Sequence, residues 1–136
     1  MNARLITLNV LAVAAVYWAW AMGYVQFAFG GDQSRMGYVI AVIVAASIAA
    51  AFAGRKAHLL RAAWLCETLG FAGTLIGITT GLSGAGDLST TEGIIAAGNA
   101  LYAGMATAFC STLIGAAGML WLWGVAQVMG ASGDKA

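Results

Sequence analysis

The chain has no proline, one histidine and few charges, and these shortages exclude several classes of protein. Only 8% of its residues are charged and 62% are hydrophobic, whereas about 25% are charged in an average soluble domain. His58 is the only histidine, and no CxxC or HExxH motif is present, so one chain lacks the ligands of the common metal sites. We therefore expect no metal, no cofactor and no enzymatic activity.

Charge and cysteine content argue against two further classes of protein, nucleic-acid-binding proteins and disulfide-stabilised proteins. The formal net charge is +1, and no basic stripe of the kind that binds nucleic acid is present. The two cysteines, Cys66 and Cys110, lie inside apolar runs, so we expect buried thiols rather than a disulfide framework. With a mean hydropathy of +0.88, the chain is predicted to be an all-α integral membrane protein with a single transmembrane domain over residues 1–136.

Four apolar runs predict four membrane-spanning helices, because about 20 residues cross the ~30 Å hydrocarbon layer. The runs are residues 5–29, 36–53, 62–82 and 93–129. The first is longer than the apolar core of a signal peptide, which has about 7–15 residues, so we expect it to remain in the protein. A tight polar turn at residues 30–35 predicts that the second run pairs antiparallel with the first, with this turn on the outer side.

The fourth run is longer than a membrane is thick. As one helix, residues 93–129 would extend about 55 Å, against ~30 Å of hydrocarbon. The helix is therefore expected to tilt, to project beyond the membrane or to break near Gly115 or Gly118. We favour projection on the cytoplasmic side.

Positive charges predict the orientation of the spans. Residues 54–61 form the most basic segment, and basic loops stay on the cytoplasmic side. With four spans, both termini are then cytoplasmic, and the expected location is the inner membrane. Of the six Lys and Arg residues, those placed inside are Arg4, Arg55, Lys56, Arg61 and Lys135, and Arg35 is placed outside.

Small residues recur along the last two runs at the spacing of one helix face. Such rows let helix backbones approach closely within a membrane. The residues expected at this close contact are Gly70, Gly73, Gly77, Gly81, Gly104, Ala108 and Gly115.

Two segments of this hairpin resemble a known family. Residues 69–77 (LGFAGTLIG) and 104–115 (GMATAFCSTLIG) are similar to the LGxxGTxxG signature and the threonine-bearing helix of the MotA/TolQ/ExbB proton-channel subunits. Four spans with this hairpin last resemble the MotA branch. That branch carries a charged cytoplasmic domain between the second and third spans, where this chain has only residues 54–61. The resemblance therefore implies a minimal channel core.

The family resemblance also implies an assembly and a mechanism. It predicts a homopentamer around two copies of a single-span partner of the MotB/TolR/ExbD type, whose membrane aspartate carries the proton. Proton flow would then drive mechanical motion between the two. The third and fourth spans would be innermost, and the first two would face lipid.

The resemblance places Thr74 and Thr112 on the proton pathway, with Ser111 as a further hydroxyl. The alternative is that each hydroxyl only bonds its own helix backbone. Counted inward from the outer turn, Thr74 and Thr112 lie at depths of about 14 Å and about 30 Å. We favour successive points along one path; the alternative is that the fourth helix starts outside the hydrocarbon, as a periplasmic cap, which would bring both threonines to one depth.

Two other polar residues lie within the last two runs. Glu67 is the only acid inside an apolar run, and such acids are functional by default. Because Arg61 is nearby, we favour a salt bridge, an interhelical hydrogen bond or a headgroup contact over proton transfer. Asn99 is expected to bond across helices, either at the pore or between subunits.

Two alternative functions remain open from the sequence. The first is a small four-helix proton-coupled transporter, although such transporters usually carry an acid in the first helix, and residues 5–29 contain none. The second is a holin-like structural pore protein without a partner, which agrees with the absence of acids at the predicted mid-membrane level.

Overall fold

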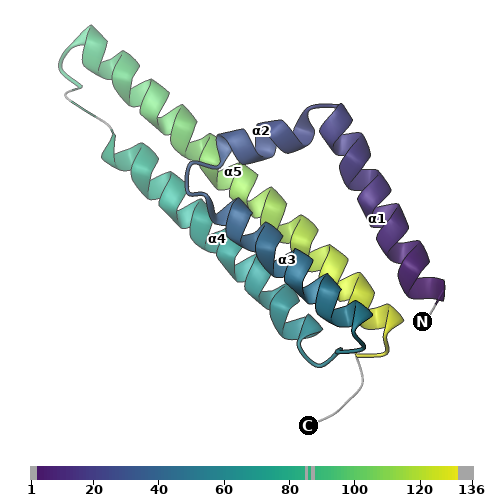
Figure 1. The fold of residues 1–136 in the computed structure, drawn as a ribbon. Helices are drawn as coiled ribbons and strands as arrows, with labels where there is room; N and C mark the ends of the chain where they lie inside the picture. The colour runs from purple at the N-terminus through teal and green to yellow at the C-terminus, as the bar shows by residue number, and fades with distance from the viewer. Residues whose placement is uncertain (1–2, 85, 87, 132–136) are drawn as a thin grey trace.

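The computed structural model describes residues 3–84, 86 and 88–131, and all regular structure within them is helical (Figure 1). The predicted all-α fold is thus confirmed. The five helices are α1 (Ala3–Ala21), α2 (Tyr24–Gly31), α3 (Met36–Phe52), α4 (Leu59–Ser83) and α5 (Thr91–Val128).

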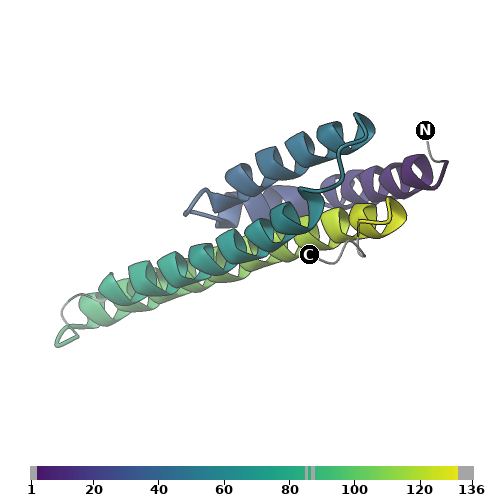
Figure 2. The ribbon, with the colours of Figure 1, turned by 90° about the horizontal axis from the view of Figure 1, so that it is seen from below.

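Helices α4 and α5 form a long antiparallel hairpin, and they lie side by side in both views (Figures 1 and 2). Their backbones touch where glycines face each other. A Cβ atom added at Gly77 would lie 2.6 Å from the Gly104 carbonyl oxygen, and one at Gly115 would lie 2.8 Å from the Gly70 Cα. The small residues predicted at this contact are all buried, namely Gly70, Gly73, Gly77, Gly81, Gly104, Ala108 and Gly115.

The first apolar run is divided, which corrects the single helix predicted over residues 5–29. Helix α1 ends at Ala21 and α2 begins at Tyr24, so the chain turns at Gly23, whose φ is 84°. Glycine adopts this left-handed conformation without the steric cost of a Cβ. Hydropathy does not change at this point, and the helix is interrupted by the backbone conformation of a single glycine. Helix α2 therefore runs at an angle to α1 (Figure 1).

Three of the described helices are long and apolar enough to cross a membrane, which is typical of a membrane protein. They are α1, α4 and α5, with 19, 25 and 38 residues. Helix α3 is apolar but shorter, with 17 residues, so four full-length spans are not confirmed. Helix α5 is continuous through Gly115 and Gly118, which excludes a break, one of the three alternatives given for its length.

Helix α5 begins well beyond the end of α4. The last turn of α4 packs against the third and fourth turns of α5, because a Cβ at Gly81 would lie 3.2 Å from both the Ala100 carbonyl oxygen and the Gly104 Cα. The residues of α5 that precede Ala100 therefore extend past α4. Their start is capped by Thr90, whose hydroxyl accepts the Gly93 N–H at 3.1 Å.

The hydrophobic core lies at the opposite end of the hairpin, where α1, α3, α4 and α5 meet. Leu5, Ala51, Leu59 and Val125 belong to one buried cluster there. The start of α1, the α3–α4 turn and the end of α5 therefore share one end of the bundle. Helix α1 is fixed to α5 by a hydrogen bond from Trp121 Nε1 to Asn9 Oδ1 at 3.0 Å.

The glycine contact predicts a large difference between two identical substitutions on α5. Gly104→Ala places a methyl group 2.6 Å from the Gly81 Cα, which cannot move aside as a side chain can. We expect it to lower the free energy of unfolding by about 1–3 kcal/mol, measured by circular dichroism in detergent. Gly98→Ala is the control, since no described residue outside its own helix backbone lies within 4 Å of a Cβ there, and it should not destabilise. Equal stability of the two variants would contradict the close contact.

Candidate functional site

Two groups of polar side chains lie at one level of the hairpin. We call Thr74 and Thr112 the threonine pair, and Thr112 is exposed at the protein surface. We call Asp32, Ser34 and Thr107 the Asp32 cluster, which lies where the α2–α3 turn meets α5. Ser111 and Gly73 lie between the two groups.

The threonine pair joins α4 to α5. The Oγ1 atoms of Thr74 and Thr112 are 2.5 Å apart. Thr74 Oγ1 also lies 3.1 Å from the Gly70 carbonyl oxygen, and Thr112 Oγ1 lies 2.9 Å from the Ala108 carbonyl oxygen. Because each hydroxyl has one proton, one threonine donates to the other, and the second donates to a carbonyl oxygen of its own helix. The bond to the helix backbone that one interpretation of the sequence expected is thus combined with a bond between the two helices.

This contact corrects the expected depths of the two threonines. Counting along the sequence placed them about 16 Å apart and favoured successive points on a path. In the structure the two hydroxyl groups are in contact and therefore lie at the same depth. The two residue counts start at different levels, because α5 begins beyond the end of α4. The same number of residues, counted from the end of α4 and from the start of α5, therefore reaches different depths.

Ser111 lies on the buried side of the same turn of α5. It is fully buried and donates to the Ala108 carbonyl oxygen at 3.1 Å. Because Thr74 also approaches this oxygen, at 3.3 Å, hydroxyls of three residues surround one carbonyl group. Ser111 thereby connects the threonine pair to the interior of the protein.

Gly73 brings the Ser111 hydroxyl close to the α2–α3 turn. A Cβ atom added at Gly73 would lie 2.7 Å from Ser111 Oγ and 3.1 Å from Ser34 Oγ. Both hydroxyls therefore lie against the same glycine, and any side chain at this position would displace at least one of them.

Asp32 is the residue that sequence reasoning missed. It was placed in an outer turn without a role, yet its side chain is only 4% exposed. Its Oδ1 accepts the Ser34 hydroxyl at 2.5 Å, and its Oδ2 accepts the Gly37 N–H at 2.6 Å. The pattern of Asp and Ser before an apolar helix is a helix-start signal, and it could have identified the capping contact but not the burial.

Thr107 holds the α2–α3 turn against the middle of α5. Its hydroxyl donates to the Gly31 carbonyl oxygen at 3.1 Å and accepts the Gln33 N–H at 3.4 Å. Cys110, one turn further on, lies 3.8 Å from the Phe27 carbonyl oxygen. The turn predicted at the outer end of the bundle thus lies beside the centre of its longest helix.

Glu67 and Asn99 do not join either group. Both are exposed, and among the described residues Glu67 makes no ion pair with Arg61, so the salt bridge, one of the three alternatives for Glu67, does not form within one chain. Neither residue is positioned to transfer a proton to the threonine pair within one chain.

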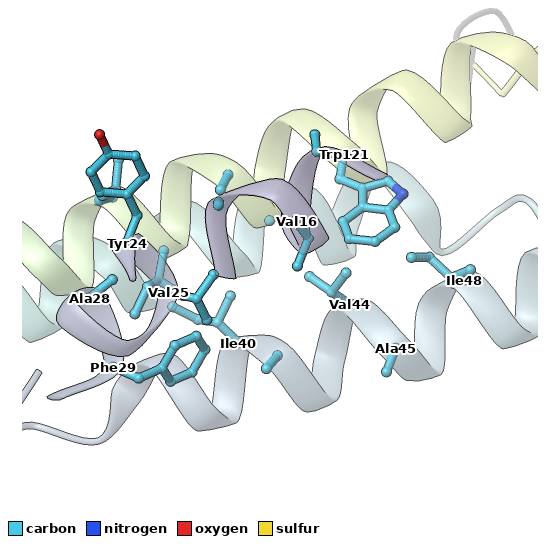
Figure 3. Close-up of a pocket in the computed structure, with 17 residues that line it drawn as sticks. Val16, Tyr24, Val25, Ala28, Phe29, Ile40, Val44, Ala45, Ile48 and Trp121 are labelled. Atoms are coloured by element: carbon cyan, nitrogen blue, oxygen red, sulfur yellow. The ribbon is translucent and has the colours of Figure 1, made fainter. Parts of the chain in front are cut away.

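A cavity of about 520 Å³ lies between α1, α2, α3 and α5, close to the site (Figure 3). Its walls are aliphatic and aromatic, with Val16, Ile40, Val44 and Trp121 among the lining residues. Within the part of the chain that the structure describes, none of the side chains lining this cavity is charged.

Comparison of the chain with protein-family models, curated proteins and solved structures gives no match. A function is therefore assigned from the geometry of the threonine pair and the Asp32 cluster, together with the resemblance of residues 69–77 and 104–115.

The Thr107 contacts predict a stability effect. Thr107→Val keeps the side-chain shape but removes the hydroxyl that links α5 to the α2–α3 turn, so the Gly31 carbonyl and the Gln33 N–H keep only their hydrogen bond to each other. We expect the free energy of unfolding to fall by about 0.5–1.5 kcal/mol, measured by denaturant titration in detergent. The control is Thr79→Val, because the exposed Thr79 hydroxyl bonds only the Leu75 carbonyl of its own helix. A Thr107→Val variant as stable as this control would show that the turn is held by other contacts.

Proposed function

We propose that the chain is a proton-channel subunit that couples proton motive force to mechanical motion, together with a single-span partner. The observation that carries the proposal is the hydrogen-bonded threonine pair on a closely packed hairpin. The two motifs that resemble the MotA/TolQ/ExbB family both include a member of this pair. Two hydroxyls that act at the same point of one pathway must lie close together, and those of Thr74 and Thr112 are in contact.

The chemistry of the pair supports this role. A proton crosses hydrocarbon only along a relay of hydroxyls, waters or titratable groups. Hydroxyls serve because each one both donates and accepts a hydrogen bond. Thr112 is exposed on the surface of the single chain, so a helix of another protein can approach it. An aspartate on the partner helix would exchange its proton there.

The exposed face of α5 supports contact with other chains. The glycine rows are buried in the α4–α5 contact within one subunit, so contacts between subunits involve other residues. Large apolar side chains flank the pair on α5, where Met105, Phe109 and Leu113 are 53%, 69% and 59% exposed. We propose that such surfaces join five subunits around two partner helices.

The proposed location is the inner membrane, with both termini on the cytoplasmic side. The start of α1, the end of α5 and the α3–α4 turn share one end of the bundle. That turn carries Arg55 and Lys56, and basic segments stay on the cytoplasmic side.

Removing both hydroxyls tests the function. Thr74→Val with Thr112→Val preserves side-chain shape, so the assembly should form normally. Proton flux should fall about tenfold or more, equivalent to a barrier increase of about 1.4 kcal/mol. The flux is measured with a pH-sensitive dye in membrane vesicles from the native cells, which retain the partner. The control is Thr79→Val with Thr80→Val, whose hydroxyls bond only their own helix. Wild-type flux in the Thr74/Thr112 variant would refute the pathway.

The proposed stoichiometry has its own test. Native mass spectrometry of the complex, extracted from membranes in mild detergent, should show five copies of this chain with two copies of a smaller protein. The expected numbers of copies rest on the resemblance of residues 69–77 and 104–115 to the MotA/TolQ/ExbB family. A dimer or tetramer of this chain would contradict the family resemblance.

A further inference from the structure

We propose that the cavity between α1, α2, α3 and α5 binds one acyl chain of a membrane phospholipid, whose phosphate lies at the level of Arg35. The inference goes beyond the proposed proton-channel function and does not depend on it. It depends only on the placement of the apolar helices in a membrane, which their length and composition indicate.

The cavity exists because α1 is attached to the bundle at its two ends. The start of α1 is fixed by Leu5 in the core cluster and by the hydrogen bond between Asn9 and Trp121. After the bend at Gly23, α2 packs against α5. Between these two attachments most residues of α1 are exposed. Helix α1 therefore passes over the cavity instead of filling it (Figure 1).

The walls of the cavity suit a hydrocarbon chain rather than water. Among the lining residues only Tyr24 and Trp121 carry a polar side-chain group, and the Trp121 N–H is already bonded to Asn9. A water molecule needs about two to four polar partners to be held in a cavity. A void without any occupant loses the dispersion contacts of its lining atoms. In a membrane, the medium that can fill such a cavity is hydrocarbon.

The size of the cavity fits one acyl chain. Its volume of about 520 Å³ holds about 17 groups the size of a water molecule, at ~30 Å³ each, and a methylene group has nearly that size. One chain of a common phospholipid has a similar number of carbon atoms. A whole phospholipid has more than twice as many, so its second chain and its headgroup remain outside the cavity.

The cavity has a buried floor and an exposed rim. Ile40 and Val44 on α3 are 1% and 8% exposed, whereas Val16 on α1 is 46% exposed. Ala45, which also lines the cavity, is exposed on α3. Figure 3 shows Val16 and Val44 pointing toward each other from opposite walls. An acyl chain can therefore enter sideways from the surrounding lipid.

The position of Arg35 gives the bound lipid its direction. The lining residues of α3 run from Ile40 to Ile48, so the cavity begins between one and two turns after Arg35 and extends about 12 Å away from it. Helix α3, with 17 residues, rises about 26 Å from the basic α3–α4 turn. This places Arg35 near the far boundary of a hydrocarbon layer of ~30 Å.

The charge of Arg35 matches the phosphate of such a lipid. Its side chain is exposed and makes no ion pair within the described part of the chain. A guanidinium group binds a phosphate through two parallel hydrogen bonds. A lipid with its phosphate at Arg35 would point its chains toward the middle of the membrane, which is the direction in which the cavity runs.

A helix of the partner or of a second copy is the competing occupant, and it is too wide. A helix has a diameter of about 10–12 Å, so its cross-section is at least roughly 80 Å². Over a length of about 12 Å, the volume of about 520 Å³ leaves a mean cross-section of only roughly 43 Å². An acyl chain is thinner than a helix and can bend to fill this width.

A bulky side chain across the cavity tests the inference. In Val16→Trp the ring projects toward Val44 and obstructs the cavity. The matched control is Val13→Trp, because Val13 lies on the same helix, is 57% exposed and does not line the cavity. Each variant is extracted with its complex from native membranes in mild detergent and washed. The phospholipid that remains bound is then measured by mass spectrometry.

We expect one phospholipid per chain in the wild type and in Val13→Trp, and about tenfold less in Val16→Trp, since overpacking opposes entry of the acyl chain. Arg35→Gln should lower the bound amount about fivefold at low salt, and Arg35→Lys, which keeps the charge, should not. Equal amounts in Val16→Trp and Val13→Trp would overturn the inference. An unchanged amount in Arg35→Gln would overturn the position given to the phosphate.

A second measurement uses the wild type alone, so it does not depend on the folding of a variant. The complex is placed in vesicles of phosphatidylcholine and phosphatidylglycerol, with part of the phosphatidylglycerol carrying a photoreactive diazirine in the middle of one acyl chain. Illumination should attach this lipid to Val44, which is buried in the floor of the cavity. Labelling confined to exposed side chains would overturn the inference, and it is the result expected if a segment of another protein fills the cavity.

Discussion

The contact between the backbones of α4 and α5 is the constraint on which the other helices depend. Lipid chains are as apolar as leucine, so helices in a membrane are held by close packing rather than by the hydrophobic effect. At Gly70–Gly115 and Gly77–Gly104 no side chain separates the two helices. The hairpin then offers a fixed surface to α3, whose Ile40 and Val44 would each lie 3.0 Å from a Cβ at Gly118.

The same contact determines which hydroxyls meet. Once the glycines fix the register of α4 against α5, Thr74 must face Thr112, and Ser111 must face Gly73. Gly73 has two roles, because its missing side chain admits Ser111 from α5 and Ser34 from the α2–α3 turn. Helix packing and the positions of these hydroxyls thus depend on one arrangement of small residues, so a substitution in the row would disturb both.

Helix content, the hairpin and its glycine contact were predictable because they depend on composition and on spacing along one helix. The break at Gly23 was not, since one glycine changes the backbone direction without changing hydropathy. The pairing of Thr74 with Thr112 was the less favoured of two alternatives, because it depends on how far α5 extends past α4 rather than on distance along the chain. Asp32 was identified as part of a turn, but its burial depends on which part of α5 the turn contacts.

The break at Gly23 also explains why an acidic residue lies inside the bundle. Asn9 is hydrogen-bonded to Trp121 at one level, and Gly31 accepts from Thr107 at another. At 1.5 Å per residue, a straight helix from Asn9 to Gly31 would extend about 33 Å, whereas Trp121 and Thr107 are separated by about 21 Å along α5. A straight first helix would therefore carry the turn about two helical turns past Thr107. Because the chain bends at Gly23, the turn stops at Thr107 and Asp32 is buried against the centre of the hairpin instead of lying near its end.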